Sequence, residues 1–268
     1  MQSFISYSSR LYFRVNNCEA TSYLRTMKKI AMIPARYAAS RFPGKLMQLL
    51  GDKTVIATVY LATKETGLFD DVVVVTDSDI IYNEIKSIGG NPIKSKRKHE
   101  SGTDRIAEAA EELDVEIILN VQGDTPFIKK DPLQKLLQLF DDESVQVGSL
   151  MQVIADEQTI SDPNRVKVCV DKKNNSLFFS RSIIPYPRNK NSSMVHYEHI
   201  GVYAFRKKSL LDFTRWPISP LEDTEKIECL RYLENGVPLR MAITDFIGIS
   251  IDSPEDLQKA RTMLASLA

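Results

Sequence analysis

The stretch KIAMIPARYAASRFPGK, residues 29–45, decides the fold that this sequence predicts. Its first part, Lys29 to Ile33, is a short apolar run typical of a buried strand, and the rest is a loop with proline, glycine and cationic side chains. Open α/β sheets bind their ligands at loops that follow the carboxyl ends of strands. Arg36, Arg41 and Lys45 are suited to a polyphosphate, so the expected ligand is a nucleoside triphosphate. A solvated loop with ordinary surface charges is the alternative interpretation.

Helices and strands alternate after this loop. Residues 54–64 place apolar side chains on one helical face, 71–77 form a continuous apolar strand, and 78–90 predict a second helix that Ser78 caps. A short strand is expected at 91–94. The alternation implies right-handed crossovers, and therefore an α/β fold with a doubly wound, mixed but mostly parallel sheet.

The second decisive stretch is EIILNVQGDTP, residues 116–126. Its apolar positions predict a central strand, Gly123 lets the backbone approach a ligand, and Asp124 stands at the carboxyl end. Asp252 likewise ends an apolar run, 247–252, which predicts a closing strand. If both strands belong to one parallel sheet, the carboxylates open beside the basic loop and form a magnesium-triphosphate site. Ordinary turn aspartates are the alternative.

The motif HESGTDR, residues 99–105, precedes an evident helix. Ser101 or Thr103 is expected to cap this helix, and a cap alone accounts for the motif about as well as a ligand site does. His99 lies in a run rich in lysine and arginine, which favours a surface position. The sequence has neither the Walker pattern GxxxxGK[ST] nor the dinucleotide pattern GxGxxG.

The texture of the sequence becomes β-rich at about 145–215, which predicts a smaller lobe added to the main sheet. In its last strand the period of two puts His199, Gly201 and Tyr203 on one face. That face either packs on the main sheet or forms a wall for a polar substrate.

Residues 220–236 predict one amphipathic helix. Glu225 and Glu228 are spaced to share a side of it, and an exposed acidic face is the default interpretation for such residues.

At 268 residues the chain is long enough for one large domain with its own core. Its 35 basic and 35 acidic residues balance, so the overall charge favours neither nucleic acid nor an anionic membrane. Cys18, Cys169 and Cys229 are widely spaced, which argues against a disulfide framework or a structural zinc site and favours a reducing compartment. No apolar run is long enough to cross a bilayer, so we expect a soluble protein. Residues 1–26 form an N-terminal extension, either of transit-peptide composition or, as we favour, upstream of the true start at Met27.

Seven motifs together resemble one enzyme family. They are IPARYAASRFPGK, HESGTDR, NVQGD, FFSRSIIP, HIGVYAF, PLEDTEKIECLR and DSPEDL, and they run in order from about Lys28 to the end of the chain. In this respect the sequence is similar to the 3-deoxy-manno-octulosonate (Kdo) cytidylyltransferases. The resemblance implies a nucleotide-diphospho-sugar transferase domain over 27–268, with the lobe serving dimerisation and sugar binding. It also implies a homodimer that joins CTP and Kdo to give CMP-Kdo and pyrophosphate.

The resemblance also implies roles for individual residues. The expected catalytic residues are Arg36, Lys45, Asp124 and Asp252, and the two aspartates are the expected Mg²⁺ ligands. The residues expected to bind substrate are Arg36, Arg41, Lys45, Ser101, Gln122, Arg181, His199, Tyr203 and Glu228, of which the last four form the sugar set. Arg181 is expected to pair with the Kdo carboxylate through two hydrogen bonds.

Two positions depart from the family pattern. Thr125 stands where the family usually has glutamate, and Cys229 stands where it usually has glutamine, an amide that can read a sugar hydroxyl. An amino-Kdo or a sialic-type ulosonic acid therefore remains an alternative substrate, and a nucleotide-binding regulatory protein is an alternative of another class. If Kdo is the substrate, the expected setting is cytoplasmic synthesis of lipopolysaccharide.

Overall fold

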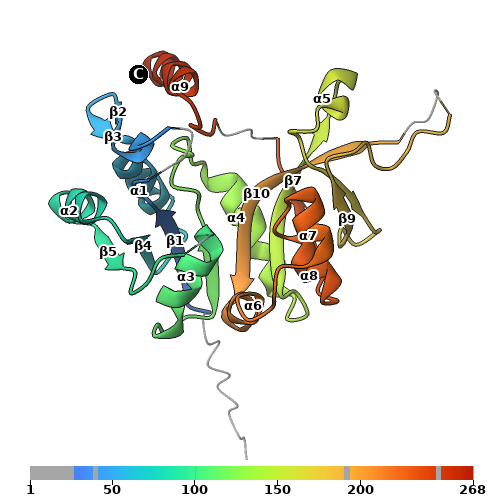
Figure 1. Cartoon of the computed structure of the whole chain (residues 1–268), viewed down its shortest axis with the longest axis horizontal. Coiled ribbons are helices and arrows are strands. Elements are labelled where there is room, and N and C mark those ends of the chain that lie inside the picture. The colour runs from blue at the N-terminus through green and yellow to red at the C-terminus, as the bar shows by residue number, and fades with distance from the viewer. Residues whose placement is uncertain (1–26, 39–41, 100, 190–193, 246–248, 268) are drawn as a thin grey trace, which may run out of the picture.

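The computed structural model describes residues 27–38, 42–99, 101–189, 194–245 and 249–267 (Figure 1). Its centre is a nine-stranded sheet with the main order β11-β7-β10-β6-β1-β4-β5, from which β8 and β9 branch at β10. The strands are β1 (Lys29–Ala35), β4 (Asp71–Thr76), β5 (Asn91–Lys94), β6 (Ile117–Asn120), β7 (Val147–Ile154), β8 (Lys167–Val170), β9 (Ser176–Ser180), β10 (His196–Arg206) and β11 (Leu239–Ile243). The pairs β1–β4, β1–β6, β4–β5 and β7–β11 are parallel, while β10 runs antiparallel to β6 and β7. The predicted α/β class and mixed, mostly parallel sheet are confirmed.

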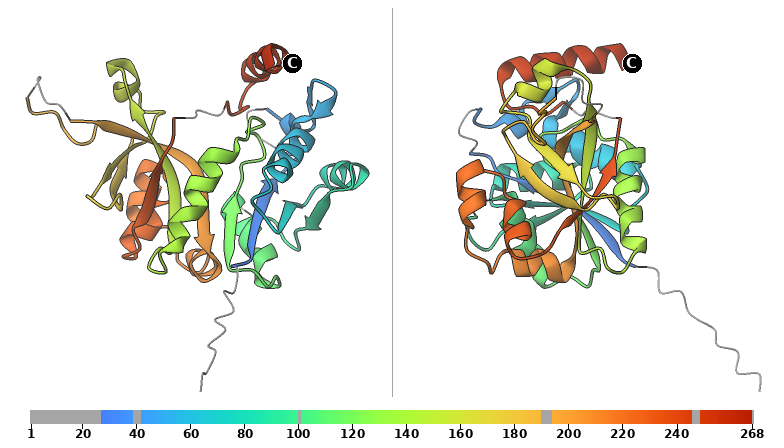
Figure 2. Two further views of the ribbon diagram at one scale, coloured as in Figure 1. Left: turned by 180° about the vertical axis from the view of Figure 1, so that it is seen from behind. Right: turned by 90° about the vertical axis from the view of Figure 1, so that its right-hand side faces the viewer.

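Helices cover both faces of this sheet. Those of the described chain are α1 (Val55–Glu65), α2 (Asp79–Ser87), α3 (Gly102–Glu111), α4 (Lys130–Gln138), α5 (Glu157–Ser161), α6 (Lys207–Phe213), α7 (Pro220–Glu225), α8 (Leu230–Glu234) and α9 (Pro254–Leu267). Figure 2 (right) shows α4 and the α7–α8 region on opposite sides of the strands. Alternating residues of β1 enter different cores, with Ile33 in the core beside α1 and Met32 in the core beside α3. Each such buried side chain contributes about 1.5–3 kcal/mol.

Local sequence signals set where several helices begin. The Ser78 hydroxyl accepts a hydrogen bond from the backbone N–H of Ile81 at the start of α2, as predicted. At the start of α3 the Ser101 hydroxyl accepts one from Asp104 at 3.0 Å. The hairpin of β2 (Leu49–Leu50) and β3 (Lys53–Thr54) leads into α1 and packs against α9. These signals act within a few residues, which is why they are legible in the sequence.

The segment 145–215 is continuous with the main sheet. Its strands β7 and β10 are members of the main order, and β8 and β9 extend from β10 as an antiparallel branch. Figure 1 shows β9 and the far part of β10 projecting beyond the body of the sheet.

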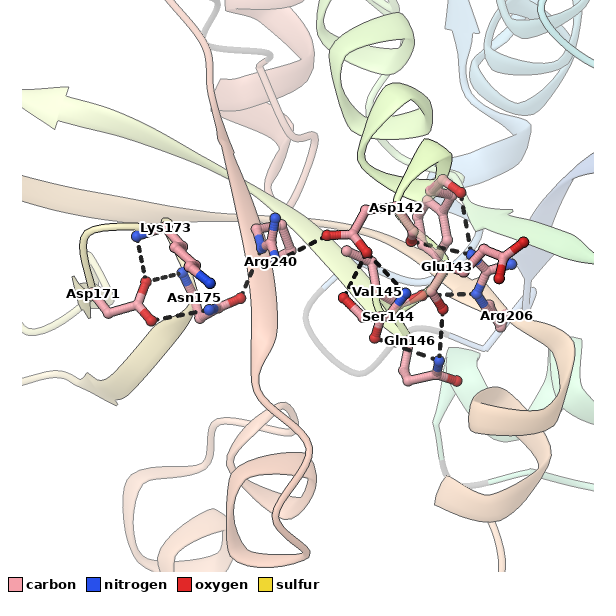
Figure 3. A network of polar contacts seen from close by, with 11 residues as sticks. Asp142, Glu143, Ser144, Val145, Gln146, Asp171, Lys173, Asn175, Arg206 and Arg240 are labelled. Atoms are coloured by element: carbon pink, nitrogen blue, oxygen red, sulfur yellow. Dashed lines mark hydrogen bonds and ion pairs between the residues drawn. The ribbon is translucent and has the colours of Figure 1, made fainter.

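A polar network ties this branch to the sheet at the edge where β7 and β11 begin (Figure 3). Arg240 on β11 donates to Asn175 Oδ1 at 2.7 Å, next to the turn between β8 and β9. Asp171 holds that turn by accepting hydrogen bonds from the backbone N–H groups of Lys173 and Asn175. The branch therefore has a fixed position relative to β11.

The single helix predicted over 220–236 is wrong, because the chain forms two short helices, α7 and α8. Lys226 adopts a left-handed conformation with φ of 52°, which ends α7 and turns the chain. Arg231 on α8 donates to both carboxylate oxygens of Glu222 on α7, at 2.5 and 2.6 Å, and holds the two helices together. Glu225 and Glu228 consequently point into different surroundings and share no helical face.

The predicted closing strand over 247–252 is also wrong for the part that the structure describes. Residues 249–252 form no strand, and 246–248 lie outside the described residues. Instead, the backbone N–H of Ile251 donates to the carbonyl oxygen of Asp124 at 2.9 Å. Asp252 therefore reaches the carboxyl edge of the sheet as part of a loop that rests on the turn after β6.

Candidate active site

A cavity of about 310 Å³ opens at the carboxyl ends of β1 and β6. It is lined by Pro34, Ala35, Arg36, Phe42, Lys45, Leu46, His99, Ser101, Gly102, Arg105, Gln122, Gly123, Asp124 and Asp252. The structure thus gathers Arg36, Lys45, Ser101, Gln122, Asp124 and Asp252 around one space, while Arg41 lies outside the described residues. Cationic and anionic groups from distant parts of the chain meet there.

The Lys45 ammonium connects two carboxylates. Its Nζ lies 2.6 Å from Asp124 Oδ2 and 3.0 Å from Asp252 Oδ1. Burial disfavours the charged form of Lys45, but the nearby charges and hydrogen bonds of Asp124 and Asp252 outweigh it, so that the pKa of Lys45 is raised. The three groups that the sequence placed at one edge of the sheet are in direct contact.

Glycine residues let these side chains come together. Gly44 has a left-handed φ of 69°, directly before the short 3₁₀ helix η1 (Lys45–Met47), and its N–H donates to the Tyr37 carbonyl at 3.0 Å. A Cβ added at Gly123 would lie 3.1 Å from the Pro34 carbonyl oxygen. The turn that carries Asp124 therefore packs directly on the backbone that leaves β1.

The N-terminus of α3 borders the same cavity. Ser101 caps the helix and also donates from its hydroxyl to Asp104 Oδ2 at 2.9 Å. A Cβ at Gly102 would come within 3.0 Å of the Pro34 side chain, so the helix start lies close against β1. Backbone N–H groups at a helix N-terminus favour an anion, and this end of the cavity is suited to one.

Arg105 was not singled out by residue-level reasoning, although it is part of the HESGTDR motif. Its side chain is 4% exposed and donates to Ser95 Oγ at 3.0 Å and to Asp77 Oδ2 at 3.2 Å. Burial raises the pKa of Asp77, but the Arg105 guanidinium outweighs it and leaves that pKa lowered. A buried guanidinium is thus fixed in the cavity wall.

The expected surface position of His99 is wrong. Its side chain is only 4% exposed, and Nε2 lies 3.0 Å from Oε2 of Glu108, whose side chain is also largely buried. The Lys96 N–H donates to the same carboxylate oxygen, so Glu108 anchors the chain that leads to Ser101. The charged neighbours of His99 do not indicate its burial. The only sequence signal that pointed to a role for His99 is its place in the HESGTDR motif.

Arg181 does not line this cavity in the part of the chain that the structure describes. Its Nε donates to the Glu225 carbonyl at 2.7 Å, and its terminal nitrogens donate to the carbonyls of Pro163 and Lys226. The Glu225 carboxylate in turn accepts from Ser180 Oγ and from the Arg181 N–H. Arg181 therefore holds the turn between α7 and α8.

His199 is buried beneath the bulge in β10. Its Nε2 lies 2.9 Å from the Ser149 hydroxyl, and burial lowers its pKa to about 4, so the imidazole is neutral near pH 7. The Tyr203 ring is 5.4 Å from that of His199, and burial followed by the neighbouring Cys229 and Glu228 raises the Tyr203 pKa. Neither ring lines the cavity.

Glu228 lies beside this aromatic pair and near Thr103 and Asp104 of α3. Its Oε1 is buried and has no hydrogen-bond partner among the described residues, and burial raises the pKa of its carboxyl group. Oδ1 of Asn120, which is opposite Tyr203 in the β6–β10 pairing, is also buried and has no hydrogen-bond partner among the described residues. Buried polar atoms are normally paired, so this region lacks donors that a ligand or water would supply.

A second, mainly apolar cavity of about 240 Å³ adjoins the first at Gln122. Thr125 lines it together with the β10 bulge, where Gly201 is exposed. Bulges often occur next to active sites because they redirect side chains. The family glutamate that Thr125 replaces would have introduced a carboxylate here.

The donor set of the main cavity is compatible with magnesium. Asp124 and Asp252 offer carboxylate oxygens, and Mg²⁺ typically takes one or two protein carboxylates and completes its shell with water and substrate phosphates. Within the described ranges no group of three or more His, Cys, Asp or Glu residues is arranged to hold a metal. The site therefore fits a cation that arrives with phosphate ligands.

Comparison with known proteins gives concordant matches. A family model described as cytidylyltransferase matches residues 30–243. A 3-deoxy-manno-octulosonate cytidylyltransferase of Flavobacterium johnsoniae is 54% identical over 244 residues, covering 90% of this chain and 100% of that protein. The corresponding enzyme of Thermodesulfovibrio yellowstonii is 40% identical over 251 residues, covering 89% and 98%.

Solved structures agree with these matches. A CMP:2-keto-3-deoxy-manno-octonic acid synthetase complexed with CTP has a TM-score of 0.86 and 34% identity, covering 90% of this chain and 100% of that one. A 4-diphosphocytidyl-2C-methyl-D-erythritol synthase of Anaerococcus prevotii, at 16% identity and a TM-score of 0.58, shares the fold. Among the described residues no helix is long and apolar enough to span a membrane.

Proposed function

Since this chain belongs to the cytidylyltransferase family, among the 3-deoxy-manno-octulosonate cytidylyltransferases, we propose that it transfers CMP from CTP to the anomeric hydroxyl of Kdo. Pyrophosphate is the second product. The observation that carries the proposal is the contact of Lys45 with Asp124 and Asp252 in a cavity at the carboxyl edge of the sheet. Open α/β sheets bind nucleotides at that edge.

The chemistry is an in-line displacement at the α-phosphorus of CTP. Arg36 and Lys45 hold the triphosphate, and the N-terminus of α3 with Ser101 and Gln122 shapes the pocket for the nucleotide or sugar. Asp124 and Asp252 would hold Mg²⁺, and the bound cation would neutralise negative charge on the phosphate oxygens. Fixed cationic side chains lower the barrier because they need not reorganise during the reaction.

The sugar is proposed to bind near Arg181, His199, Tyr203 and Glu228. Glu228 Oε1 and Asn120 Oδ1 lack donors among the described residues, and the hydroxyl groups of a sugar supply them. For Arg181 to pair with the sugar carboxylate, its guanidinium must exchange carbonyl acceptors in the α7–α8 turn for that ligand. Sugar binding would thus be coupled to movement of this turn.

We further propose that the protein works as a homodimer in the cytoplasm and feeds lipopolysaccharide synthesis. Support for a dimer comes from apolar side chains exposed between β9 and β10. Tyr186 is 83% exposed, and Ile183, Met194 and Val195 are also exposed. Large apolar side chains that gather on an exposed surface mark interaction sites, and Tyr186 and Met194 line one hollow. Light scattering of the full chain should give twice the monomer mass, and a monomer at micromolar concentration would contradict this.

Pyrophosphate release with CTP and a panel of ulosonic acids, with and without Mg²⁺, tests the function. We expect release only when CTP, Kdo and a divalent cation are present together. Faster release with an amino-Kdo or a sialic-type acid would reassign the substrate, and would point to Cys229, whose thiol lies against Tyr203 in place of an amide. Nucleotide binding without release for every acid would favour a regulatory binder.

A further inference from the structure

The Lys45 ammonium lies between Asp124 and Asp252, the two carboxylates that we propose hold a divalent cation. It lies 2.6 Å from one carboxylate and 3.0 Å from the other. The Lys45 and Asp124 side chains are only 14% and 22% exposed, so water screens this contact incompletely. Lys45 is therefore a counter-ion that the two carboxylates share.

An ammonium and a divalent cation compete for these oxygen atoms. Mg²⁺ needs near-octahedral oxygen ligands at about 2.0–2.1 Å, and it dehydrates reluctantly. An ammonium and a divalent cation that contact the same carboxylate oxygens lie close together, and their positive charges repel strongly in a partly buried site. The two cations do not share the carboxylates unless another anion draws one of them away.

The local backbone allows such an exchange. Gly44 and Tyr37 fix the chain before Lys45 through a 3.0 Å hydrogen bond, and the Ile251 N–H fixes the Asp124 carbonyl. The four-carbon lysine side chain is flexible, so its ammonium can change partners while these backbone contacts persist. Arg36 lines the same cavity and offers a second cation to a triphosphate.

We propose that Lys45 is a placeholder for the divalent cation. Without nucleotide its ammonium neutralises Asp124 and Asp252 and keeps divalent cations weakly bound; the triphosphate of an arriving nucleotide attracts the ammonium, so cation and nucleotide bind together. This inference rests on the proposed function, which assigns the two carboxylates to the cation and a triphosphate to the cavity. A purely structural ion pair is the competing explanation, in which Lys45 only ties Asp252 to the sheet.

Mn²⁺ binding to the nucleotide-free protein, measured by the electron paramagnetic resonance of free Mn²⁺, separates the two explanations. K45M should bind Mn²⁺ at least tenfold more tightly than the wild type, because the Lys45 ammonium no longer competes for the two carboxylates. K53M is the matched control, since Lys53 is an exposed lysine paired with Asp52, and it should bind like the wild type. Equal or weaker binding by K45M overturns the placeholder, because a structural tie predicts that outcome.

Two further measurements test the proposal. With α,β-methylene-CTP, wild-type protein should bind Mn²⁺ at least tenfold more tightly than without it. Equal Mn²⁺ affinity with and without the analogue also overturns the proposal. The K45M/D124N protein should lose the gain in affinity of K45M. If it does not, the assignment of Asp124 in the proposed function fails, whereas loss of the gain leaves that assignment intact. Should K45M not fold by circular dichroism, K45Q takes its place.

Discussion

The proposed nucleotide end of the site, around Lys45, and its proposed sugar end, around Glu228, differ in how completely their polar groups are hydrogen-bonded. At the nucleotide end, Lys45 contacts Asp124 and Asp252, and Arg105 contacts Asp77. At the sugar end, Glu228 Oε1 and Asn120 Oδ1 are buried without partners in the described part of the chain. The fold itself pairs the charged groups at the proposed nucleotide end, whereas at the proposed sugar end it leaves two buried acceptors unpaired among the described residues. The following predictions test this difference, beginning with the largest effect.

Replacing Asp124 by asparagine should abolish turnover, by a factor of at least about 1,000, because the neutral amide neither holds a cation nor pairs with Lys45. The fold should persist, since the Asp124 backbone still accepts from Ile251. Initial rates and circular dichroism provide the test. An active Asp124→Asn enzyme would contradict the role of Asp124 in the proposed nucleotide end.

His199 should make stability sensitive to acid. Its pKa is lowered to about 4 by burial, below the ordinary 6.5, so between these values the unfolded chain takes up a proton that the native protein does not. The stabilisation is present above pH 6.5 and is lost as pH falls toward 4, and it amounts to about 3 kcal/mol. Urea unfolding of wild type and His199→Gln at pH 7 and 4.5 should show the wild type losing more stability. Parallel losses would contradict the buried neutral imidazole.

Arg105→Met should destabilise the protein by about 2 kcal/mol, because the partly buried Asp77 loses its counter-ion. It should also weaken CTP binding, since Arg105 lines the cavity. Calorimetry of CTP binding and urea unfolding measure the two effects. Arg97→Met is the control, because Arg97 is largely exposed and lies 3.5 Å from Glu108. If the two variants show the same stability and the same CTP affinity, the contact of Arg105 with Asp77 does not organise the nucleotide end.

Glu228→Gln should raise the KM for the sugar about tenfold and leave the KM for CTP unchanged, because one acceptor of sugar hydroxyls becomes a donor. The carboxyl pKa is raised by burial, so the native protein retains a proton that the unfolded chain releases. That contribution is present below about pH 4.5 and is lost as pH rises through the native pKa. The melting temperature of the variant, relative to that of the wild type, should therefore rise as the pH rises. A change in the KM for CTP alone would contradict the sugar role of Glu228 and would assign this residue to the nucleotide end.

Much of the fold and half of the site were accessible from the sequence. The apolar runs that became β1, β4 and β6, the caps Ser78 and Ser101, and the cavity residues Lys45 and Asp124 follow from period and turn chemistry. The burial of His99 could not be predicted from the composition around it, because its partner Glu108 lies on a helix face that the local composition does not reveal.

The sequence by itself determined strands such as β1, β4 and β6, helices such as α2 and α3, and which residues follow those strands, since those properties depend on neighbours a few positions away. Only the tertiary structure decided that Asp252 reaches the site on a loop, that Lys226 separates Glu225 from Glu228, and that Arg181 binds carbonyls. Lys45 is 79 residues from Asp124 and 207 from Asp252. Contacts across such separations depend on how whole elements pack, and no local pattern encodes that packing.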